Sequence, residues 1–358
     1  MRRLTVLNVA YPLAPVGPDA VGGAEQVLTE LDAALTRAGH RSLVVACEGS
    51  ATAGTLLATP RVPGPLDGRA RRTAHERHRR AVRAALGAWP VDVVHLHGID
   101  FHAYLPPPGP PALVTLHLPP DWYPPEALYP SRPRTHLHCV SAAQRRACPP
   151  GPALLPDVVP NGVAAERFTA ARHARRNFAL ALGRICPEKG FHVALDAARR
   201  AGVPLLIGGH VFGYEAHEHY FRREIEPRLD RARRFIGPVG WPRKRRLLSA
   251  ARCLLVPSLA PETGCLVAME ALACGTPVIA LPSGALPEVV EHGVTGFLVR
   301  DGREMAEAIP AAADLDPEDC RRAARERFPL RRTIEGYLGL YRRLALGEAA
   351  ERSPAPIA

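Results

Sequence analysis

Short apolar runs alternate with helix-like segments along most of the chain, and this alternation constrains the fold more than any other feature. In the first half, the runs expected to form strands lie at 4–10, 42–47, 91–97, 113–117 and 137–141. A second series lies at 178–183, 205–208, 234–236, 253–257, 278–281 and 296–299. Strands that alternate with helices form parallel sheets whose two faces are both covered. Two such series predict an α/β protein with two doubly wound, Rossmann-like parallel-sheet domains.

The domain limits follow from these two series and from the length of 358 residues. A chain of this length favours two domains over one. We place an N-terminal domain at 1–168 and a C-terminal domain at 169–332, with the linker within 161–175. Residues 347–358 are expected to form a frayed tail. Because ligands of doubly wound sheets bind beyond the carboxyl ends of the strands, we expect the site in a cleft between the domains.

The charge is strongly basic and comes almost entirely from arginine. The net charge is +11, and only Lys189 and Lys244 among the 46 basic residues are lysines. In so arginine-rich a chain, a retained lysine favours a position that needs a compact ammonium group. Arginines cluster at 69–83, 222–246 and 321–343. They predict either solvated helix faces or a peripheral contact with an anionic membrane, for which the weakly amphipathic run at 69–83 is the best candidate. No nucleic-acid recognition motif is present, so nucleic acid is not an expected partner.

Cysteine usage and the N-terminus indicate a cytoplasmic protein. Eight cysteines are scattered along the chain without a C-x-x-C motif, and several lie in apolar segments. We interpret them as small buried hydrophobic residues in a reducing compartment. The apolar run at 4–10 is interrupted by Asn8 and predicts a first strand and not a signal peptide. No run approaches the roughly 20 apolar residues of a membrane span.

The segment 257–277 carries the most chemical information. It predicts a turn that contains Glu262, followed by a helix from about 265 to 275 that contains Glu270. The free N–H groups and the dipole at a helix N-terminus bind anions. Two carboxylates beside such a site fit an anion that also carries hydroxyl groups, and a nucleotide sugar has both. The alternative is a buried strand–helix unit with a solvated glutamate on its helix.

Other candidate residues lie where predicted strands lead into helices. Arg184 and Lys189 flank a tight turn after the strand at 178–183, and two cations there suit a diphosphate. Gly22 and Gly23 precede the first long helix and would let the backbone approach an anion closely. Ordinary surface and strand–helix turns are the alternatives in both places.

Two histidines end predicted strands of the first domain. His117 follows the strand that begins at Leu113, and His97 follows the strand that begins at Val91. A functional and a structural role are equally open for His117, whereas a structural role is favoured for His97. The loops that follow are rich in aromatic residues, which predict either a stacking platform for a sugar or apolar acceptor, or plain loop packing. These residues are Phe101, Tyr104, Trp122, Tyr123 and Tyr129.

No metal site is expected. The D-x-D sequence at 314–316 lies away from any strand end, and the H-x-H pairs at 136–138 and 217–219 lack further ligands at useful spacing. The sequence contains no G-x-S-x-G motif and no recognisable nucleophile–base set.

Together these residues resemble the retaining glycosyltransferases of family 4, which have the GT-B fold. The resemblance covers most of residues 4–300 and is most specific after residue 160. The matching features are Gly-Gly at 22–23, His117, Pro-Asn-Gly-Val at 160–163, Gly-Arg-x5-Gly with its lysine at 183–190, Pro-Glu-x7-Glu-Ala-x-Ala-x-Gly-Thr-Pro-Val at 261–278, and the glycine-rich stretch 284–296. In this fold the last helix crosses back to the first domain, and residues 333–346 suit that helix.

The resemblance implies a retaining transfer of a sugar from a nucleotide diphosphate sugar to a carbohydrate, lipid or small-molecule acceptor. It implies no cofactor apart from this co-substrate. In the donor site Arg184 and Lys189 would hold the diphosphate. The other implied phosphate contacts come from Gly22, Gly23 and the backbone around Cys265, Leu266 and Val267.

The resemblance also assigns the remaining site residues. Glu262 would contact the donor sugar near the reacting carbon, Glu270 would bind the ribose, and His117 would lie near the reaction centre. Glu262 and His117 are therefore the predicted catalytic residues. The chain departs from the family at Gly264-Cys265, because the family has an aromatic residue followed by glycine there. Cys265 adds a side chain where a bare backbone is usual.

The expected mechanism needs no metal. Cations and a helix N-terminus can stabilise the charge that develops on the leaving β-phosphate, and in a front-face mechanism this phosphate takes the proton of the acceptor. Two alternatives remain open at this point. One is a nucleotide-sugar epimerase of the same fold, and the other is a non-catalytic protein that binds nucleotide sugars.

Overall fold

The computed structural model describes residues 2–169 and 176–347, which form two compact units. Unit 1 contains the described residues up to Pro160 and those from Thr333 onward, and unit 2 spans Asn161–Arg332. The division falls before the predicted boundary at residue 168, because Phe168 of α5 (Ala165–Thr169) is buried in the core of unit 2. Residues 170–175 of the predicted linker and 348–358 of the predicted tail lie outside the described residues.

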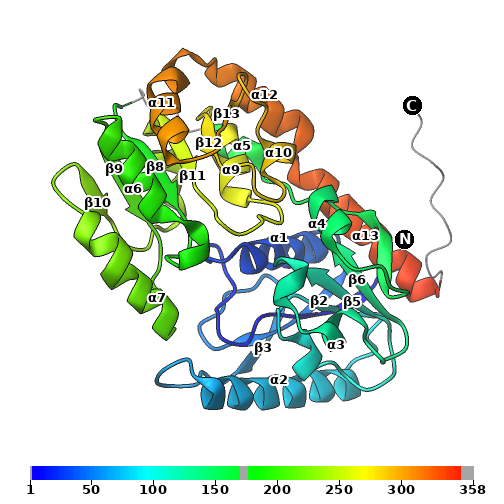
Figure 1. The fold of residues 1–358 in the computed structure, drawn as a ribbon. Coiled ribbons are helices and arrows are strands. Elements are labelled where there is room, and N and C mark those ends of the chain that lie inside the picture. The colour runs from blue at the N-terminus through cyan, green and yellow to red at the C-terminus, as the bar shows by residue number, and fades with distance from the viewer. Residues whose placement is uncertain (1, 170–175, 348–358) are drawn as a thin grey trace. The chain divides into compact units, whose positions relative to one another are not determined.

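Unit 1 contains a parallel sheet of seven described strands in the order β3-β2-β1-β4-β5-β6-β7 (Figure 1). The strands are β1 (Thr5–Val9), β2 (Arg41–Cys47), β3 (Thr55–Thr59), β4 (Val93–Leu96), β5 (Ala112–Leu116), β6 (Thr135–Cys139) and β7 (Leu154–Val158). The helices are α1 (Gly23–Arg37), α2 (Gly68–Ala88), α3 (Pro125–Leu128), α4 (Ala142–Ala147) and the part of α13 (Leu330–Leu346) that begins at Thr333. The first predicted helix, 24–38, corresponds to α1, which ends before Gly39 with its positive φ of 77°.

Unit 2 contains a second parallel sheet, of six described strands in the order β10-β9-β8-β11-β12-β13 (Figure 1). The strands are β8 (Ala179–Leu182), β9 (Leu205–Gly208), β10 (Arg233–Phe235), β11 (Cys253–Val256), β12 (Val278–Ala280) and β13 (Gly296–Leu298). Besides α5, its helices are α6 (Phe191–Arg200), α7 (Glu215–Tyr220), α8 (Trp241–Ala250), α9 (Leu266–Ala273), α10 (Leu286–Val289), α11 (Gly302–Ala311) and α12 (Pro317–Arg327).

Both faces of the unit 2 sheet are covered at its inner strands, which explains why β8, β9, β11 and β12 are continuously apolar. Side chains alternate between the two faces of a strand. Leu180 and Leu254 therefore pack in one core with α9 and α12, whereas Ala181 and Leu255 pack in the other with α6 and α11. Such double coverage is the normal arrangement for parallel sheets.

One face of the unit 1 sheet is polar although it is buried. His95 of β4 and Thr115 of β5 lie against α13, while their neighbours along the strands face an apolar core. The His95 Nδ1 atom lies 2.7 Å from the hydroxyl of Tyr341, and its Nε2 atom lies 2.8 Å from the Thr115 hydroxyl. Thr115 in turn lies 3.1 Å from the hydroxyl of Tyr337. This network fixes α13 on the sheet, since buried polar groups need their partners.

The arginine-rich run at 69–83 lies on α2. Ala74 and Val82 of this run and the following Ala85 are buried in unit 1, so these residues are not available to insert into a membrane. A contact of the arginines with an anionic membrane stays a prediction. The arginines Arg69, Arg71, Arg72, Arg80 and Arg83 are exposed. None of the described helices has the length and apolar character that a membrane-spanning helix requires.

Candidate active site

The loops that carry most predicted site residues converge at one point of unit 2. From β8 the chain runs outward through β9 to β10 on one side of the sheet. It then returns to β11, on the other side of β8, and runs outward through β12 to β13. This reversal is the topological switch point, where doubly wound sheets bind ligands. Arg184 and Lys189 follow β8, and Glu262 and Cys265 follow β11. The fold therefore places both groups at the carboxyl ends of two adjacent strands.

Lys189 and Glu262 form an ion pair at this point. The Nζ atom of Lys189 lies 2.5 Å from Oε1 of Glu262, and the hydroxyl of Ser258 also donates to that oxygen. The side chains of Lys189 and Glu262 are 26% and 12% exposed, respectively. The pair is thus largely shielded from water, where a charge–charge contact is stronger than at the surface.

This environment keeps both groups of the pair charged. Burial alone would raise the pKa of Glu262, but the charge and hydrogen bond of Lys189, the Ser258 hydroxyl and the charge of Arg184 lower that pKa below its usual value. Burial alone would lower the pKa of Lys189, but Glu262 raises it above its usual value. A carboxylate and two cations are therefore held together beside the start of α9.

Glu270 pairs with the other lysine of the chain. It lies in the middle of α9, its side chain is 8% exposed, and its Oε1 atom lies 2.6 Å from Nζ of Lys244 on α8. Both predicted donor-site glutamates are thus held by a lysine, and these are the only two lysines in the sequence. The sequence left open the alternative that Glu270 is a solvated residue on an exposed helix face. This alternative is wrong.

Helix α9 begins at a strained residue. Cys265 is the N-cap and has φ 42° and ψ 64°, a left-handed conformation that favours glycine. At the preceding Gly264 a Cβ atom would lie 2.6 Å from Nδ2 of Asn161, so a side chain there would displace the Asn161 amide. Leu266 and Val267 are the first two residues of α9, and the first N–H groups of a helix have no acceptor within it. Burial raises the pKa of the Cys265 thiol, so the N-cap side chain carries no charge.

Gly22 and Gly23 stand at the start of α1 in unit 1, as expected. A Cβ atom at Gly22 would lie 1.8 Å from Oε2 of Glu25 in the first turn of the helix. Gly22 therefore allows the Glu25 carboxylate to fold back against the helix N-terminus. A phosphate contact at Gly22 and Gly23 stays a prediction.

His117 follows β5 in unit 1 and is held from two sides. Its backbone N–H donates to the hydroxyl of Tyr123 over 3.1 Å, and its Nε2 atom lies 3.0 Å from Nδ1 of His97, which follows β4. Burial lowers the pKa of His117 to about 3 and that of His97 well below its usual value, so both rings are neutral at pH 7.

The aromatic residues of the unit 1 loops do not form a common platform. Phe101 and Tyr104 are fully buried and Tyr123 is 4% exposed, so these three pack in the apolar core. Tyr129 is 52% exposed. Of the two alternatives drawn from the sequence, loop packing holds for the three buried rings.

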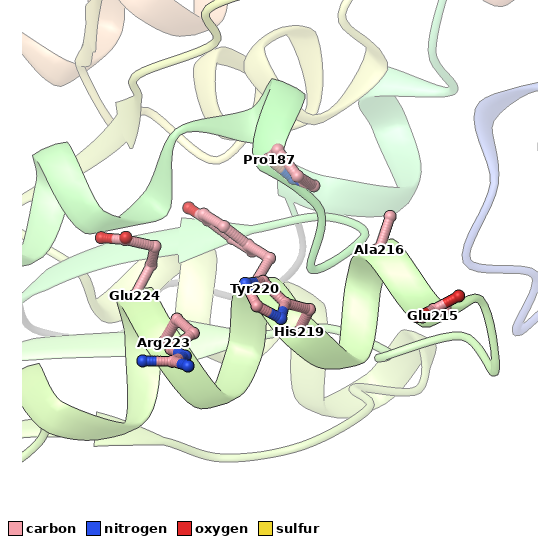
Figure 2. A pocket seen from close by; sticks show the side chains of 7 residues that line it. All are labelled: Pro187, Glu215, Ala216, His219, Tyr220, Arg223 and Glu224. Atoms are coloured by element: carbon pink, nitrogen blue, oxygen red, sulfur yellow. The ribbon is translucent and has the colours of Figure 1, made fainter.

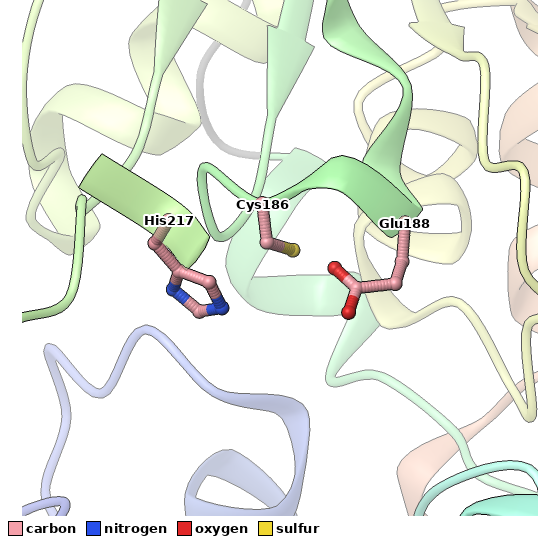
Figure 3. A group of neighbouring side chains, drawn as sticks. All are labelled: Cys186, Glu188 and His217. Atoms are coloured by element: carbon pink, nitrogen blue, oxygen red, sulfur yellow. The ribbon is translucent and has the colours of Figure 1, made fainter. Parts of the chain in front are cut away.

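One group of side chains in unit 2 has the spacing of metal ligands. Cys186, Glu188 and His217 each offer an atom within 4.8 Å of the others, and Figure 3 shows the thiol and the carboxylate facing each other. The set of sulfur, nitrogen and oxygen would suit Zn²⁺. However, Arg184 is close enough to act on His217, where burial and then this positive charge lower the imidazole pKa, and the same charge disfavours a bound cation. We assign no metal to these residues.

A pocket of about 420 Å³ lies nearby in unit 2 and includes Pro187, the residue between Cys186 and Glu188 (Figure 2). Its other lining residues belong to α7 and to the π-helical segment Phe221–Ile225 that continues it, namely Glu215, Ala216, His219, Tyr220, Arg223 and Glu224. None of the predicted donor-site residues lines it. Two glutamates against one arginine give it no preference for a diphosphate, so the switch point remains the candidate for the predicted donor site.

Sequence reasoning missed two residues of the site. Lys244 was visible as one of only two lysines, but nothing in the sequence indicates its contact with Glu270. Ser258 follows β11 and lies only four positions before Glu262, which it contacts. A serine at that spacing gives no signal without the conformation of the loop.

Two family models match the chain. One, described as glycosyl transferases group 1, matches residues 163–327, and the other, described as glycosyltransferase family 4, matches residues 21–167. The D-inositol 3-phosphate glycosyltransferase of Saccharomonospora viridis is 36% identical over 210 residues, which cover 51% of this chain and 48% of that protein. The enzyme of that name from Mycolicibacterium smegmatis is 34% identical over 221 residues, 56% of this chain and 50% of that protein. The chain matches about half the length of these curated relatives.

Similar solved structures extend over nearly the whole chain. AviGT4, a glycosyltransferase involved in avilamycin A biosynthesis, is 27% identical with a TM-score of 0.70, and the match covers 96% of this chain and 98% of that one. Sucrose-phosphate synthase from Thermosynechococcus elongatus is 21% identical with a TM-score of 0.78, covering 96% of this chain and 100% of that one. The fold is therefore GT-B, as the sequence predicts.

Proposed function

The chain belongs to glycosyltransferase family 4, and we propose that it transfers a sugar from a nucleoside diphosphate sugar to an acceptor hydroxyl with retention of the anomeric configuration. The observation that carries the proposal is the placement of two lysine–glutamate pairs beside α9, next to the switch point of the unit 2 sheet. A diphosphate needs cations and N–H groups, and a sugar or ribose needs carboxylates that accept hydrogen bonds from hydroxyl groups. The residues around α9 supply both.

Each residue has a role in this proposal. Arg184 and Lys189 bind the diphosphate together with the first N–H groups of α9, at Leu266 and Val267. Glu270 accepts hydrogen bonds from the ribose. Glu262 accepts hydrogen bonds from the donor sugar. Because Lys189 already contacts Glu262, the site holds its charges in place before the donor binds, so little reorganisation is needed.

The transfer itself breaks the bond between the anomeric carbon and the β-phosphate oxygen and forms one between that carbon and the acceptor oxygen. Negative charge develops on the phosphate, where Arg184, Lys189 and the helix N-terminus stabilise it without a metal. Positive charge develops at the anomeric carbon, beside the Glu262 carboxylate. The acceptor proton passes to the departing phosphate, as in a front-face mechanism. We propose Glu262 and His117 as the catalytic residues.

For the acceptor we propose a polyhydroxylated compound, and inositol phosphates are the first to test. The two curated relatives are named for D-inositol 3-phosphate. Carbohydrate, lipid and other small-molecule acceptors are the further candidates.

A donor panel tests the proposal. The full chain is incubated with UDP-, GDP-, ADP- and dTDP-linked sugars, with and without an inositol phosphate, and the released nucleoside diphosphate and the sugar products are measured in the presence of EDTA. Release of the nucleoside diphosphate with a product that keeps the anomeric configuration of the donor sugar supports a retaining transferase. Formation of an epimeric nucleotide sugar identifies an epimerase, and binding without turnover identifies a non-catalytic protein. Glu262→Gln is the matched control, because it keeps the shape of the side chain and removes its charge.

A further inference from the structure

His97 and His117 meet edge to edge in the interior of unit 1. His97 Nδ1 and His117 Nε2 are 3.0 Å apart, whereas the ring centroids are 5.3 Å apart and the ring planes differ by only 19°. The two nitrogens therefore point at each other nearly in the ring planes, which is the geometry of a hydrogen bond between rings. Burial lowers the pKa of both histidines, so one hydrogen atom lies between the two nitrogens.

The other nitrogen of His97 decides which ring supplies that hydrogen. His97 Nε2 is buried and has no hydrogen-bond partner among the described residues. If His117 donated, the single hydrogen of His97 would be on this Nε2 atom and would be an unpaired buried donor. If His97 donates from Nδ1, its Nε2 is only an unpaired acceptor. Proteins tolerate buried unpaired acceptors better than buried unpaired N–H groups, so the hydrogen is on Nδ1 of His97.

The polar layer beneath α13 holds His97 in this orientation. The ring of His95 lies 3.9 Å from that of His97 between centroids. His95 is itself fixed by hydrogen bonds at both nitrogens, to Tyr341 and to Thr115. A side chain locked in this way orients the group that it contacts, as outer ligands orient a metal-bound histidine.

We propose that His97 is a positioning residue that fixes His117 in the tautomer with its hydrogen on Nδ1, so that His117 does not act as a general base in the reaction. This second half rests on the proposed function. With Nε2 occupied by the His97 N–H and Nδ1 carrying a hydrogen, the His117 ring has no lone pair left for the acceptor proton. The proton must then leave on the phosphate as the acceptor oxygen bonds to the anomeric carbon.

The tautomer is measured directly by long-range ¹H–¹⁵N correlation spectra of the full chain labelled with ¹⁵N-histidine, without donor or acceptor. The His117 signals are assigned by their loss in His117→Gln. We expect a neutral His117 with its hydrogen on Nδ1 from pH 8 to pH 5. A hydrogen on Nε2, or a titration of His117 near its ordinary pKa, would overturn the proposal. Because no reaction is involved, this result is independent of whether the chain is a transferase.

Two variants test the role of His97. His97→Asn keeps a side-chain N–H close to the position of Nδ1, whereas His97→Phe fills the space without a donor. We expect His97→Asn to keep the His117 tautomer and a kcat within about threefold of the unchanged protein, and His97→Phe to mix the tautomers and lower kcat by about tenfold with less effect on donor KM. If the tautomer in His97→Phe equals that of the unchanged protein, His97 is not its cause. If His97→Phe does not fold, the His117 tautomer in His97→Asn is compared with that in the unchanged protein, and a different tautomer contradicts the proposal.

Discussion

Replacing Lys189 by methionine should destabilise unit 2 at neutral pH, and the loss should shrink in acid. The substitution keeps the length of the side chain and removes the ammonium group that contacts Glu262. It leaves a carboxylate that is only 12% exposed and retains the hydroxyl of Ser258 as a partner. The variant thus measures the cost of removing the contacting ammonium group from a shielded carboxylate, with the charge of Arg184 still present.

The size of the effect follows from the exposure of the pair. Removing one partner of a fully buried ion pair costs about 3–5 kcal/mol, whereas an exposed pair contributes about 0–1 kcal/mol. Lys189 is 26% exposed and Ser258 still holds Glu262, so we expect a loss of about 2–3 kcal/mol at pH 7. For a unit of this size, such a loss corresponds to a decrease of about 4–12 °C in Tm.

The pH dependence follows from the pKa of Glu262. In the unchanged protein this pKa is lowered, so the stability due to the pair is present above the unfolded pKa and is lost as the pH falls through the folded pKa. Without Lys189, burial is opposed only by the Ser258 hydroxyl and the charge of Arg184, so the pKa of Glu262 in the folded variant is higher than in the unchanged protein. The variant therefore gains less stability than the unchanged protein as the pH rises through this range. The difference between the two proteins should therefore fall to less than about 1 kcal/mol at pH 4.

Urea unfolding followed by tryptophan fluorescence gives the measurement. Trp241 on α8 belongs to unit 2, so replacing Trp89 and Trp122 of unit 1 by phenylalanine leaves a reporter of unit 2 alone. Glu262→Gln in both backgrounds completes a double-mutant cycle, for which we expect a coupling above about 1 kcal/mol. Arg300→Met is the control, because its ion pair with Glu304 leaves the arginine 83% exposed. Equal losses at pH 7 and pH 4, or simple additivity in the cycle, would refute this reasoning.

Three further predictions concern the same site. Arg184→Ala and Lys189→Ala should each weaken nucleoside diphosphate binding in calorimetry by about 10- to 150-fold, the usual range for a lost hydrogen bond to a charged group, and unchanged affinities would place the phosphates elsewhere. Cys265→Gly should be more stable than Cys265→Ala by about 1 kcal/mol in urea unfolding, because both lose the buried sulfur but only glycine relieves the left-handed strain; equal stabilities would show that the conformation is not strained. Glu262→Gln should mainly lower kcat, since positive charge develops beside it, and Glu270→Gln should mainly raise donor KM, since the ribose does not change in the reaction; steady-state kinetics showing the reverse pattern would exchange the two roles.

In unit 1 the sequence predicts the five inner strands of the sheet, whereas in unit 2 it also predicts the edge strands β10 and β13. β3 and β7 were not predicted, and they are the two edge strands of the unit 1 sheet. Residues of β3 are partly or fully exposed over most of its length, and β7 contains an exposed proline, Pro156. Edge strands tolerate both features, because one side of the strand makes no ladder hydrogen bonds. The apolar signal that identifies a central strand is therefore absent from them.

The site was predictable as far as it depends on the fold. Arg184, Lys189 and Glu262 each follow a predicted strand, and the order of parallel strands in a doubly wound sheet then brings them to one place. The contact between Lys244 and Glu270 was not predictable, because it depends on how α8 packs against α9. The conformation of Cys265 was not predictable either, since a cysteine in sequence gives no indication of a positive φ.

The features gathered around α9 are not what stability alone would favour. A buried ion pair is often no more stable than apolar residues of the same size, yet two pairs lie here, and they use both lysines of the chain. A left-handed cysteine at the N-cap adds strain where glycine would relieve it. Deviations from local rules tend to concentrate where a protein functions. The charges are costly to bury but are already oriented, as the proposed binding of a diphosphate and of hydroxyl groups requires. The preorganisation of these charges thus accompanies a loss of stability in unit 2 at this helix.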